Sequence, residues 1–261
     1  MSEKYLIDER VIERAMQPYP DIPYIVPFST PVVSFGDASK AEMLTVGINP
    51  SSVEFLTGRK NKKLIKGNKK RLIDTETLGH NKVSNLSRGE AINVIKGCYC
   101  YFDSDKNPYM TWFKHLNSHA NSIFAADFLN GTSAHVDLVQ WATDPVWGNI
   151  KDEIVRKSLL DNDKDFLKYQ INQKQYRVVF LNGTQVFDAT TNNDILAAAV
   201  FDSIPYKTKN GANRELKLYK GITSAGSLVL GWNKPFPGHY ISAEELPRVM
   251  GIAKNSFVKQ L

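Results

Sequence analysis

Short apolar runs alternate with amphipathic segments along most of this chain. The apolar, β-prone runs predict buried strands at 42–49, 135–141, 176–181, 216–220 and 227–232. Apolar positions at helical spacing predict helices at 8–16, 87–101, 108–118, 151–171, 184–190, 193–201 and 242–260. Strands that alternate with helices are typical of an α/β fold, so we expect a three-layer α/β/α domain with a mostly parallel central sheet of about four or five strands.

Local signals refine two helices and one hairpin. Ser87 with Glu90, and Ser242 with Glu245, have the spacing of a capping box, which predicts helix starts at both places. Residues 53–57 and 63–67 flank a polar, basic stretch that contains Gly58, and this pattern predicts a β-hairpin.

The chain shows no repeat, no low-complexity linker and no composition break. We therefore predict a single domain over residues 1–261 with an N-terminal extension of about 1–35. Hydrophobic residues make up 42% of the chain, and we see no apolar run long enough to span a membrane and no signal-peptide core at the N-terminus. We expect a monomer without membrane contact, located in the cytoplasm with the nucleoid or in the nucleus.

The possible metal ligands are few and poorly spaced. Cys98 and Cys100 are the two cysteines, too few for a four-thiolate zinc or iron–sulfur site, and we expect two reduced thiols. His115 and His119 are four residues apart on a predicted helix, but Glu does not follow His115 as in H-E-x-x-H. We predict no metal, no iron–sulfur cluster and no cofactor.

Positive charge is concentrated in one segment. The formal net charge is +6, and residues 59–71 contain eight Lys or Arg residues and no acid. Such clusters attract polyanions, so we expect DNA, or RNA, as the partner. The residues assigned to this contact are Arg59, Lys60, Lys62, Lys63 and, from another loop, Lys234. The alternative is a hairpin whose charges are simply solvated.

Three predicted strands end in polar residues. The first ends in Gly47-Ile48-Asn49-Pro50, the second carries Asp137, and the third runs into the Pro- and aromatic-rich loop 232–240. Open α/β sheets bind ligands at the carboxyl edge of their strands, so these residues are the candidates for a common site. Each also has a structural alternative: a turn-bonding amide, a buried carboxylate or a packing loop.

The Gly-Ile-Asn-Pro segment after a strand resembles the first motif of the uracil-DNA glycosylase superfamily. The likeness is to the mismatch-specific and single-strand-selective branches, which carry Asn at this position. Residues 107–113 resemble the Asn-x-Phe-Trp helix start of the mismatch-specific branch, and loop 232–240 lies where the superfamily has its second motif. The resemblance spans about 41–241 with the motifs in the right order.

The resemblance implies a protein that hydrolyses the N-glycosidic bond of a flipped, damaged or mismatched base in DNA. The implied roles are water positioning for Asn49, leaving-base stabilisation for Asn233 or His239, and base binding for Gly47, Ile48, Phe55 and Asp137. The second motif reads Asn233-Lys234-Pro235 rather than His-Pro-Ser or Asn-Pro-Ser, which leaves the leaving-base role open.

The strand at 135–141 resembles the one that supplies the base-reading Asn in several branches of the superfamily, but it holds Asp137 in place of that Asn. A carboxylate only accepts hydrogen bonds, so Asp137 would favour a base with an exocyclic amine over uracil. Two alternatives remain. One is a catalytically lapsed nucleic-acid-binding module of the same fold. The other is a small-molecule hydrolase or nucleotide-binding enzyme, which the absence of a phosphate-cradling glycine motif disfavours.

Overall fold

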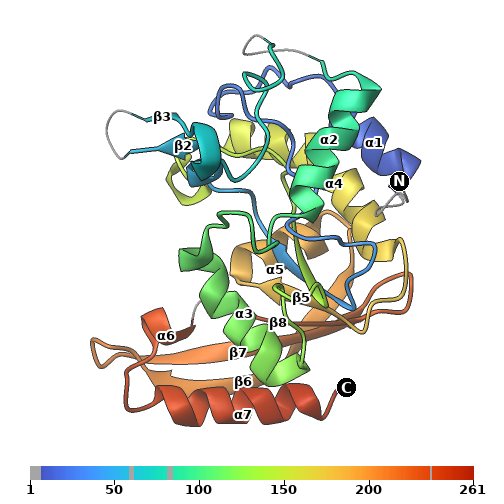
Figure 1. Cartoon of the computed structure of the whole chain (residues 1–261). Coiled ribbons are helices and arrows are strands. Elements are labelled where there is room, and N and C mark those ends of the chain that lie inside the picture. The colour runs from blue at the N-terminus through green and yellow to red at the C-terminus, as the bar shows by residue number, and fades with distance from the viewer. Residues whose placement is uncertain (1–6, 59–61, 81–84, 236) are drawn as a thin grey trace. The chain divides into compact units, whose positions relative to one another are not determined.

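A computed structural model describes residues 7–58, 62–80, 85–235 and 237–261 of the chain (Figure 1). The helices are α1 (Glu9–Met16), α2 (Arg88–Tyr99), α3 (Met110–Phe124), α4 (Glu153–Asn172), α5 (Thr184–Asn192), α6 (Pro237–Tyr240) and α7 (Leu246–Val258). The strands are β1 (Met43–Gly47), β2 (Leu56–Thr57), β3 (Lys63–Leu64), β4 (Ser133–Asp137), β5 (Val178–Asn182), β6 (Ala197–Lys207), β7 (Asn213–Ile222) and β8 (Leu228–Trp232). None of these helices combines the length and the apolarity needed to cross a lipid bilayer.

The predicted α/β class and the mostly parallel sheet are confirmed. Six strands form one sheet in the order β4-β1-β5-β8-β7-β6. β1, β5 and β8 pair in parallel, whereas β7 pairs antiparallel with both β8 and β6. β2 and β3 form a separate two-stranded antiparallel pair, as predicted, but it is short because residues Ser52–Glu54 form a 3₁₀ turn instead of extending the strand.

The contacts along the chain define two compact units. The first is built from the described residues of Met1–Ala38, Ile48–Tyr109 and Val136–Leu167. The second is built from Ser39–Gly47, Met110–His135 and the described residues of Lys168–Leu261. The prediction of a single domain with an N-terminal extension stays a prediction.

In the second unit, helices cover both faces of the sheet. Alternate residues of each strand point to one face. Phe180, Leu218 and Trp232 join a buried apolar cluster with residues of α3 and α7, and both helices lie beside the sheet in Figure 1. Tyr219 points the other way, and its ring stacks on Phe187 of α5 at 3.8 Å between ring centroids. The unit is thus layered as α3 and α7, sheet, and α5.

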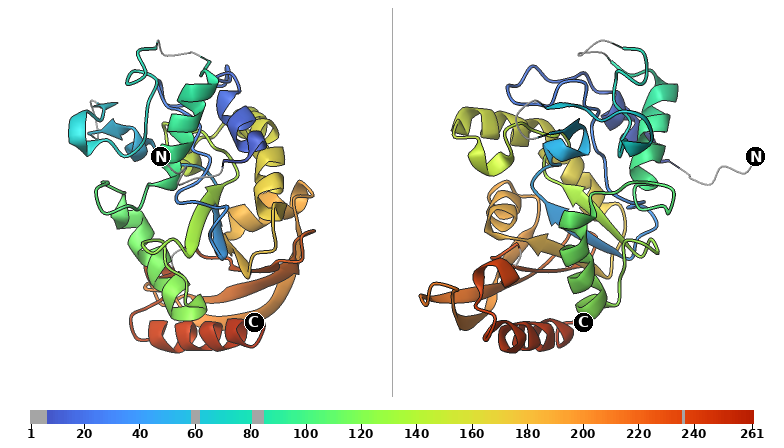
Figure 2. Two further views of the ribbon diagram at one scale, coloured as in Figure 1. Left: turned by 45° about the vertical axis from the view of Figure 1, so that its right-hand side comes forward. Right: turned by 60° about the vertical axis from the view of Figure 1, so that its left-hand side comes forward.

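In the first unit, α1 and α2 lie side by side (Figure 2). α1 carries Arg14, whose side chain is 3% exposed and whose Nη2 lies 2.6 Å from Oδ1 of Asp163 on α4. Asp163 also accepts a 2.5 Å hydrogen bond from the backbone N–H of Gln140. This buried ion pair therefore connects α1, α4 and the segment that follows β4.

Two local predictions are wrong. Residues 193–201 do not form a helix, because the chain from Ala197 pairs with β7 along eleven residues of β6 and its backbone groups are satisfied across the sheet. Ser242 and Glu245 do not form a capping box. Glu245 is itself the N-cap of α7 and makes no side-chain capping bond. The box at Ser87 and Glu90 is confirmed at the start of α2.

Candidate functional site

Asn49 lies two residues beyond the end of β1, and its amide is oriented by the chain around it. Its Nδ2 donates to the carbonyl oxygens of Pro50 at 3.0 Å and Trp141 at 3.4 Å, and lies 2.9 Å from Oγ1 of Thr143. Carbonyls only accept hydrogen bonds, so they fix which end of the amide faces them. The side-chain oxygen Oδ1 is therefore the end of the amide directed away from these groups, and it retains acceptor capacity.

Asp137 ends β4 at the same edge of the first unit. The backbone N–H of Val139 donates to the carbonyl oxygen of Ile48 at 2.8 Å, so the segments that follow β4 and β1 lie side by side beyond the strand ends. Asp137 is 3% exposed. The structure thus brings two of the predicted residues, Asn49 and Asp137, to neighbouring strand ends. Ile48 is partly buried and packs against the cluster around Trp141.

Gly47 ends β1 and is buried. It is not one of the glycines with a positive φ, so the backbone freedom expected of it is not used here.

Glu54 is a further candidate, and it is not among the residues selected from the sequence. It lies in the 3₁₀ turn that follows the Asn49 turn, is 3% exposed, and accepts a 2.7 Å hydrogen bond from the Tyr101 hydroxyl. The Tyr101 oxygen in turn accepts the backbone N–H of Tyr109 at 2.8 Å. Burial raises the pKa of Glu54 to about 7; the Tyr101 hydrogen bond and the charge of Arg71 oppose the rise, and the charge of Asp137 adds to it.

A carboxyl group with that pKa can both take up and release a proton near neutral pH. Perturbed pKa values of this kind concentrate at functional sites, although buried structural carboxylates share them. The signal in the sequence is an acid five residues after Asn49 and three residues after Ser51. Ser51 accepts the Val53 N–H at 3.5 Å and caps the turn.

The ring of Phe55 is 2% exposed, and the carbonyl oxygen of Phe55 accepts the N–H of Ile65 at 2.8 Å. A base can stack only on an open ring face, so Phe55 serves as core and not as a platform. Tyr109 is partly buried in the same unit, with the Arg71 guanidinium 5.8 Å from its ring centroid. Trp112 belongs to the second unit, where its ring meets His135 at 4.9 Å.

Asn233 belongs to the second unit and joins β8 to β7. Its Oδ1 accepts the Lys217 N–H at 3.1 Å, and its Nδ2 donates to the Glu215 carbonyl oxygen at 3.2 Å. Both ends of this amide are used within the sheet. We therefore assign Asn233 a structural role.

His239 and Lys234 lie around the short helix α6 of the same unit. The His239 side chain is exposed, and its ring centroid is 5.9 Å from that of His115. The Lys234 ammonium group lies 5.1 Å from the ring centroid of Tyr240, a cation–π distance. His239 and Tyr240 also line a pocket of about 380 Å³.

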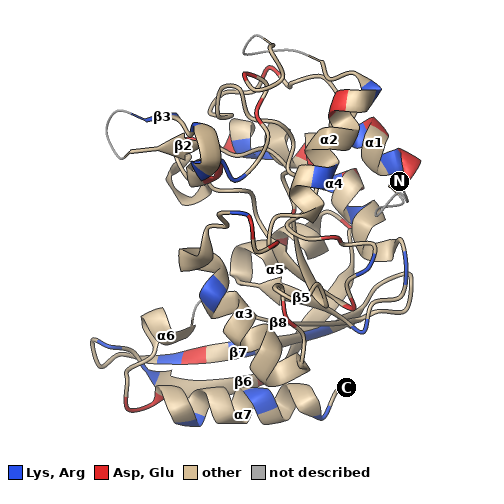
Figure 3. Ribbon diagram, in the orientation of Figure 1, with Lys and Arg blue, Asp and Glu red and all other residues tan. Residues whose placement is uncertain are grey.

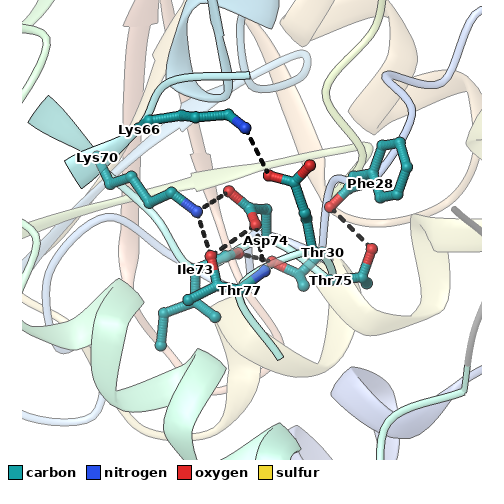
Figure 4. A network of polar contacts seen from close by, with 9 residues as sticks. Phe28, Thr30, Lys66, Lys70, Ile73, Asp74, Thr75 and Thr77 are labelled. Carbon is teal, nitrogen blue, oxygen red and sulfur yellow. Dashed lines mark hydrogen bonds and ion pairs between the residues drawn. The ribbon is translucent and has the colours of Figure 1, made fainter. Parts of the chain in front are cut away.

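The basic segment carries less free charge than its sequence indicates. Arg59 and Lys60 lie outside the described residues. Lys62 forms an ion pair with Asp144, and Lys66 lies 3.7 Å from Glu76. Lys70 lies 2.7 Å from Asp74 and also contacts Thr77 (Figure 4). Lys63 is exposed. These acids lie outside residues 59–71, so the sequence window did not reveal the neutralisation.

Within the described part of the chain, no group of three His, Cys, Asp or Glu residues is placed to hold a metal ion. Neither Cys98 nor Cys100 forms a disulfide, and burial raises the pKa of Cys98 to about 11. His135 is buried with its Nδ1 2.7 Å from Oγ1 of Thr45.

A comparison with protein-family models and with curated proteins finds no match.

Proposed function

We propose that the chain is a hydrolase of N-glycosidic bonds in DNA, of the kind that its resemblance to the uracil-DNA glycosylase superfamily implies. One observation carries the proposal. Asn49 follows a buried parallel strand with its Oδ1 directed away from its own turn, and Asp137 ends the neighbouring strand. Ligand sites of open α/β sheets form at such strand ends.

The proposal assigns one role to each side chain. Asn49 Oδ1 accepts a hydrogen from the attacking water and orients it, and ionised Glu54 takes up the proton that the water loses. The water oxygen bonds to the sugar carbon as the bond from that carbon to the base nitrogen breaks, and the base leaves with the electron pair. Asp137 is assigned to an exocyclic amine of the base, a contact that requires its carboxylate, 3% exposed, to be uncovered when the base binds.

Glu54 supplies what an amide at position 49 lacks. Asn positions water but has no proton affinity at neutral pH, whereas a carboxylate with a pKa near 7 has one. The buried hydrogen bond from Tyr101 fixes the carboxyl group, and Tyr101 is itself held by Tyr109. Tyr109 is also the ring of this unit that we propose for base stacking.

The test is release of a base from defined oligonucleotides. Single- and double-stranded DNA containing uracil, hypoxanthine, or mismatched adenine or cytosine is incubated with the protein, and abasic sites are revealed by alkaline cleavage. We expect turnover of an amine-bearing base, a loss of about 100-fold in Glu54→Gln, and a rate that rises as pH passes about 7. Glu244→Gln, an exposed acid on the other unit, is the matched control.

A second function is favoured by a specific observation. All three groups that contact Asn49 Nδ2 are groups of the protein itself, which is the pattern of an amide that only stabilises its own turn. If Asn49 has only this structural role, the protein would bind nucleic acid without catalysing hydrolysis. Salt-dependent binding of these oligonucleotides with no abasic site on any of them would select that reading.

A further inference from the structure

The turn between β6 and β7 and the end of α6 together build a pocket in the second unit. Its volume is about 380 Å³, and it is lined by Thr208, Lys209, Asn210, Ala212, Arg214, His239 and Tyr240. Two of these residues are cations, two are aromatic rings, and none is a carboxylate. The pocket is therefore cationic and aromatic at once.

Backbone hydrogen bonds hold the two walls together. Lys209 N–H donates to the Tyr240 carbonyl at 3.3 Å, Ser242 N–H donates to the Lys207 carbonyl at 3.0 Å, and Thr208 forms a bridge with Ile241. The turn itself is closed by Thr208, whose N–H donates to the Ala212 carbonyl at 2.9 Å and whose Oγ1 accepts the Ala212 N–H at 3.0 Å. The walls are thus fixed before any ligand arrives.

The cations of this pocket are not neutralised by neighbouring acids. Arg214 stands opposite Tyr206 in the strand register, and its neighbour Glu215 points to the other face of β7. Basic residues gather around the hairpin turn (Figure 3). In the described part of the chain no carboxylate lies within ion-pair distance of Lys209, Arg214 or Lys234.

The basic segment 59–71 offers a direct contrast. There, Lys62, Lys66 and Lys70 each form an ion pair with an acidic side chain, which neutralises much of their positive charge locally. Lys63 and Lys69 of that segment form no ion pair among the described residues, whereas at the hairpin pocket this holds for both lining cations, so Lys209 and Arg214 are each available to an anion.

We propose that this pocket binds a phosphorylated nucleotide unit, with the phosphate between Lys209 and Arg214 and the base against the ring of Tyr240. Its volume falls within the range of small-molecule sites and exceeds what a phosphate ion needs. Tyr240 is 41% exposed and so presents ring surface for stacking. The Asn210 amide can donate to and accept from a base edge.

The experiment measures binding of a fluorescein-labelled oligothymidylate by anisotropy and of thymidine 5′-monophosphate by calorimetry. The pocket variant is Lys209→Gln with Arg214→Gln, and the matched control is Lys168→Gln with Lys254→Gln, which removes the same charge from exposed sites elsewhere. We expect about a tenfold weaker Kd in the pocket variant and less than about a twofold change in the control. Tyr240→Ala should weaken the monophosphate about fivefold and leave inorganic phosphate unchanged.

The two probes distinguish the source of the nucleotide. If the monophosphate displaces the oligonucleotide, the pocket holds a single nucleotide, whether free or part of a strand. If only the oligonucleotide binds, and its binding depends on the pocket, the occupant is a nucleic-acid strand. Equal losses in the pocket and control variants would overturn the proposal, as would inorganic phosphate that competes as well as the monophosphate. Thymine carries no exocyclic amine, so the oligothymidylate is not a substrate of the proposed hydrolysis, and failure of that hydrolysis would leave this result standing.

Discussion

Replacing Glu54 with Gln should remove the contribution of this carboxyl group to the pH dependence of the free energy of unfolding. Gln has nearly the same shape as Glu and keeps an oxygen that can accept the Tyr101 hydroxyl. It cannot ionise, so the cost of burying a carboxylate disappears. The side chain is 3% exposed, and the substitution therefore tests burial with little change in packing.

The direction of this pH dependence follows from the pKa values of Glu54 in the folded and unfolded states. The ordinary pKa of 4.5 describes the unfolded chain, and burial raises it to about 7 in the folded protein. Between these values the folded state binds a proton that the unfolded state has lost, so stability falls as pH rises. The shift corresponds to about 3 kcal/mol in total, of which about 2–3 kcal/mol is lost between about pH 5 and about pH 8. Above about pH 7 that stabilisation is gone.

Urea unfolding of both proteins across this pH range measures the effect. We expect the free energy of unfolding of Glu54→Gln, relative to wild type, to rise by about 2–3 kcal/mol from about pH 5 to about pH 8. Other titrating groups, including His119, contribute to both proteins and cancel in the difference. Glu244→Gln should track the wild type. Parallel curves for wild type and Glu54→Gln would refute the argument that Glu54 is buried in a low-dielectric site.

Further outcomes can be measured by the same unfolding assay. Arg14→Met should cost about 3–5 kcal/mol, because it leaves Asp163 buried without its cation. Gly231→Ala should destabilise by about 1–3 kcal/mol, since a Cβ there would lie 2.5 Å from the Leu181 carbonyl oxygen. Gly251→Ala, on an exposed turn of α7 with open space around it, should stabilise by about 0.5–1 kcal/mol. Asn49→Asp should destabilise by about 1–3 kcal/mol, because a carboxylate would face two carbonyl oxygens in place of an N–H donor. An unchanged free energy of unfolding in any of these variants would contradict the physical reason given for it.

The parts of the fold that local patterns determine were predictable. The helix over α2 follows from Ser87 and Glu90, whose reciprocal capping bonds involve residues three apart. The parallel strands follow from apolar runs such as 176–181, because a strand covered on both faces must be apolar on both. Sequence therefore sufficed for the α/β class and the mostly parallel sheet.

The failures have a common cause in long-range contacts. The stretch from Ala197 reads as a helix by composition but is held as a strand by pairing with β7. Glu54 reads as an ordinary surface acid, and only Tyr101, 47 residues away, reveals that it is buried and hydrogen-bonded. Lys62 reads as a free cation, but Asp144, 82 residues away, pairs with it. In each case the deciding partner lies outside any local window.

The first motif and the groups around it can be understood together. A Gly-Ile-Asn-Pro turn without a neighbouring acid would position water but leave its proton without an acceptor. The chain places a buried carboxyl five residues later, oriented by Tyr101, with Asp137 close enough to raise the pKa of Glu54 further. Burying two carboxylates in one region costs stability, and Arg71 offsets only part of that cost. Apolar side chains would fill the same space at lower cost, and this is the physical reason to test Glu54 for proton transfer first.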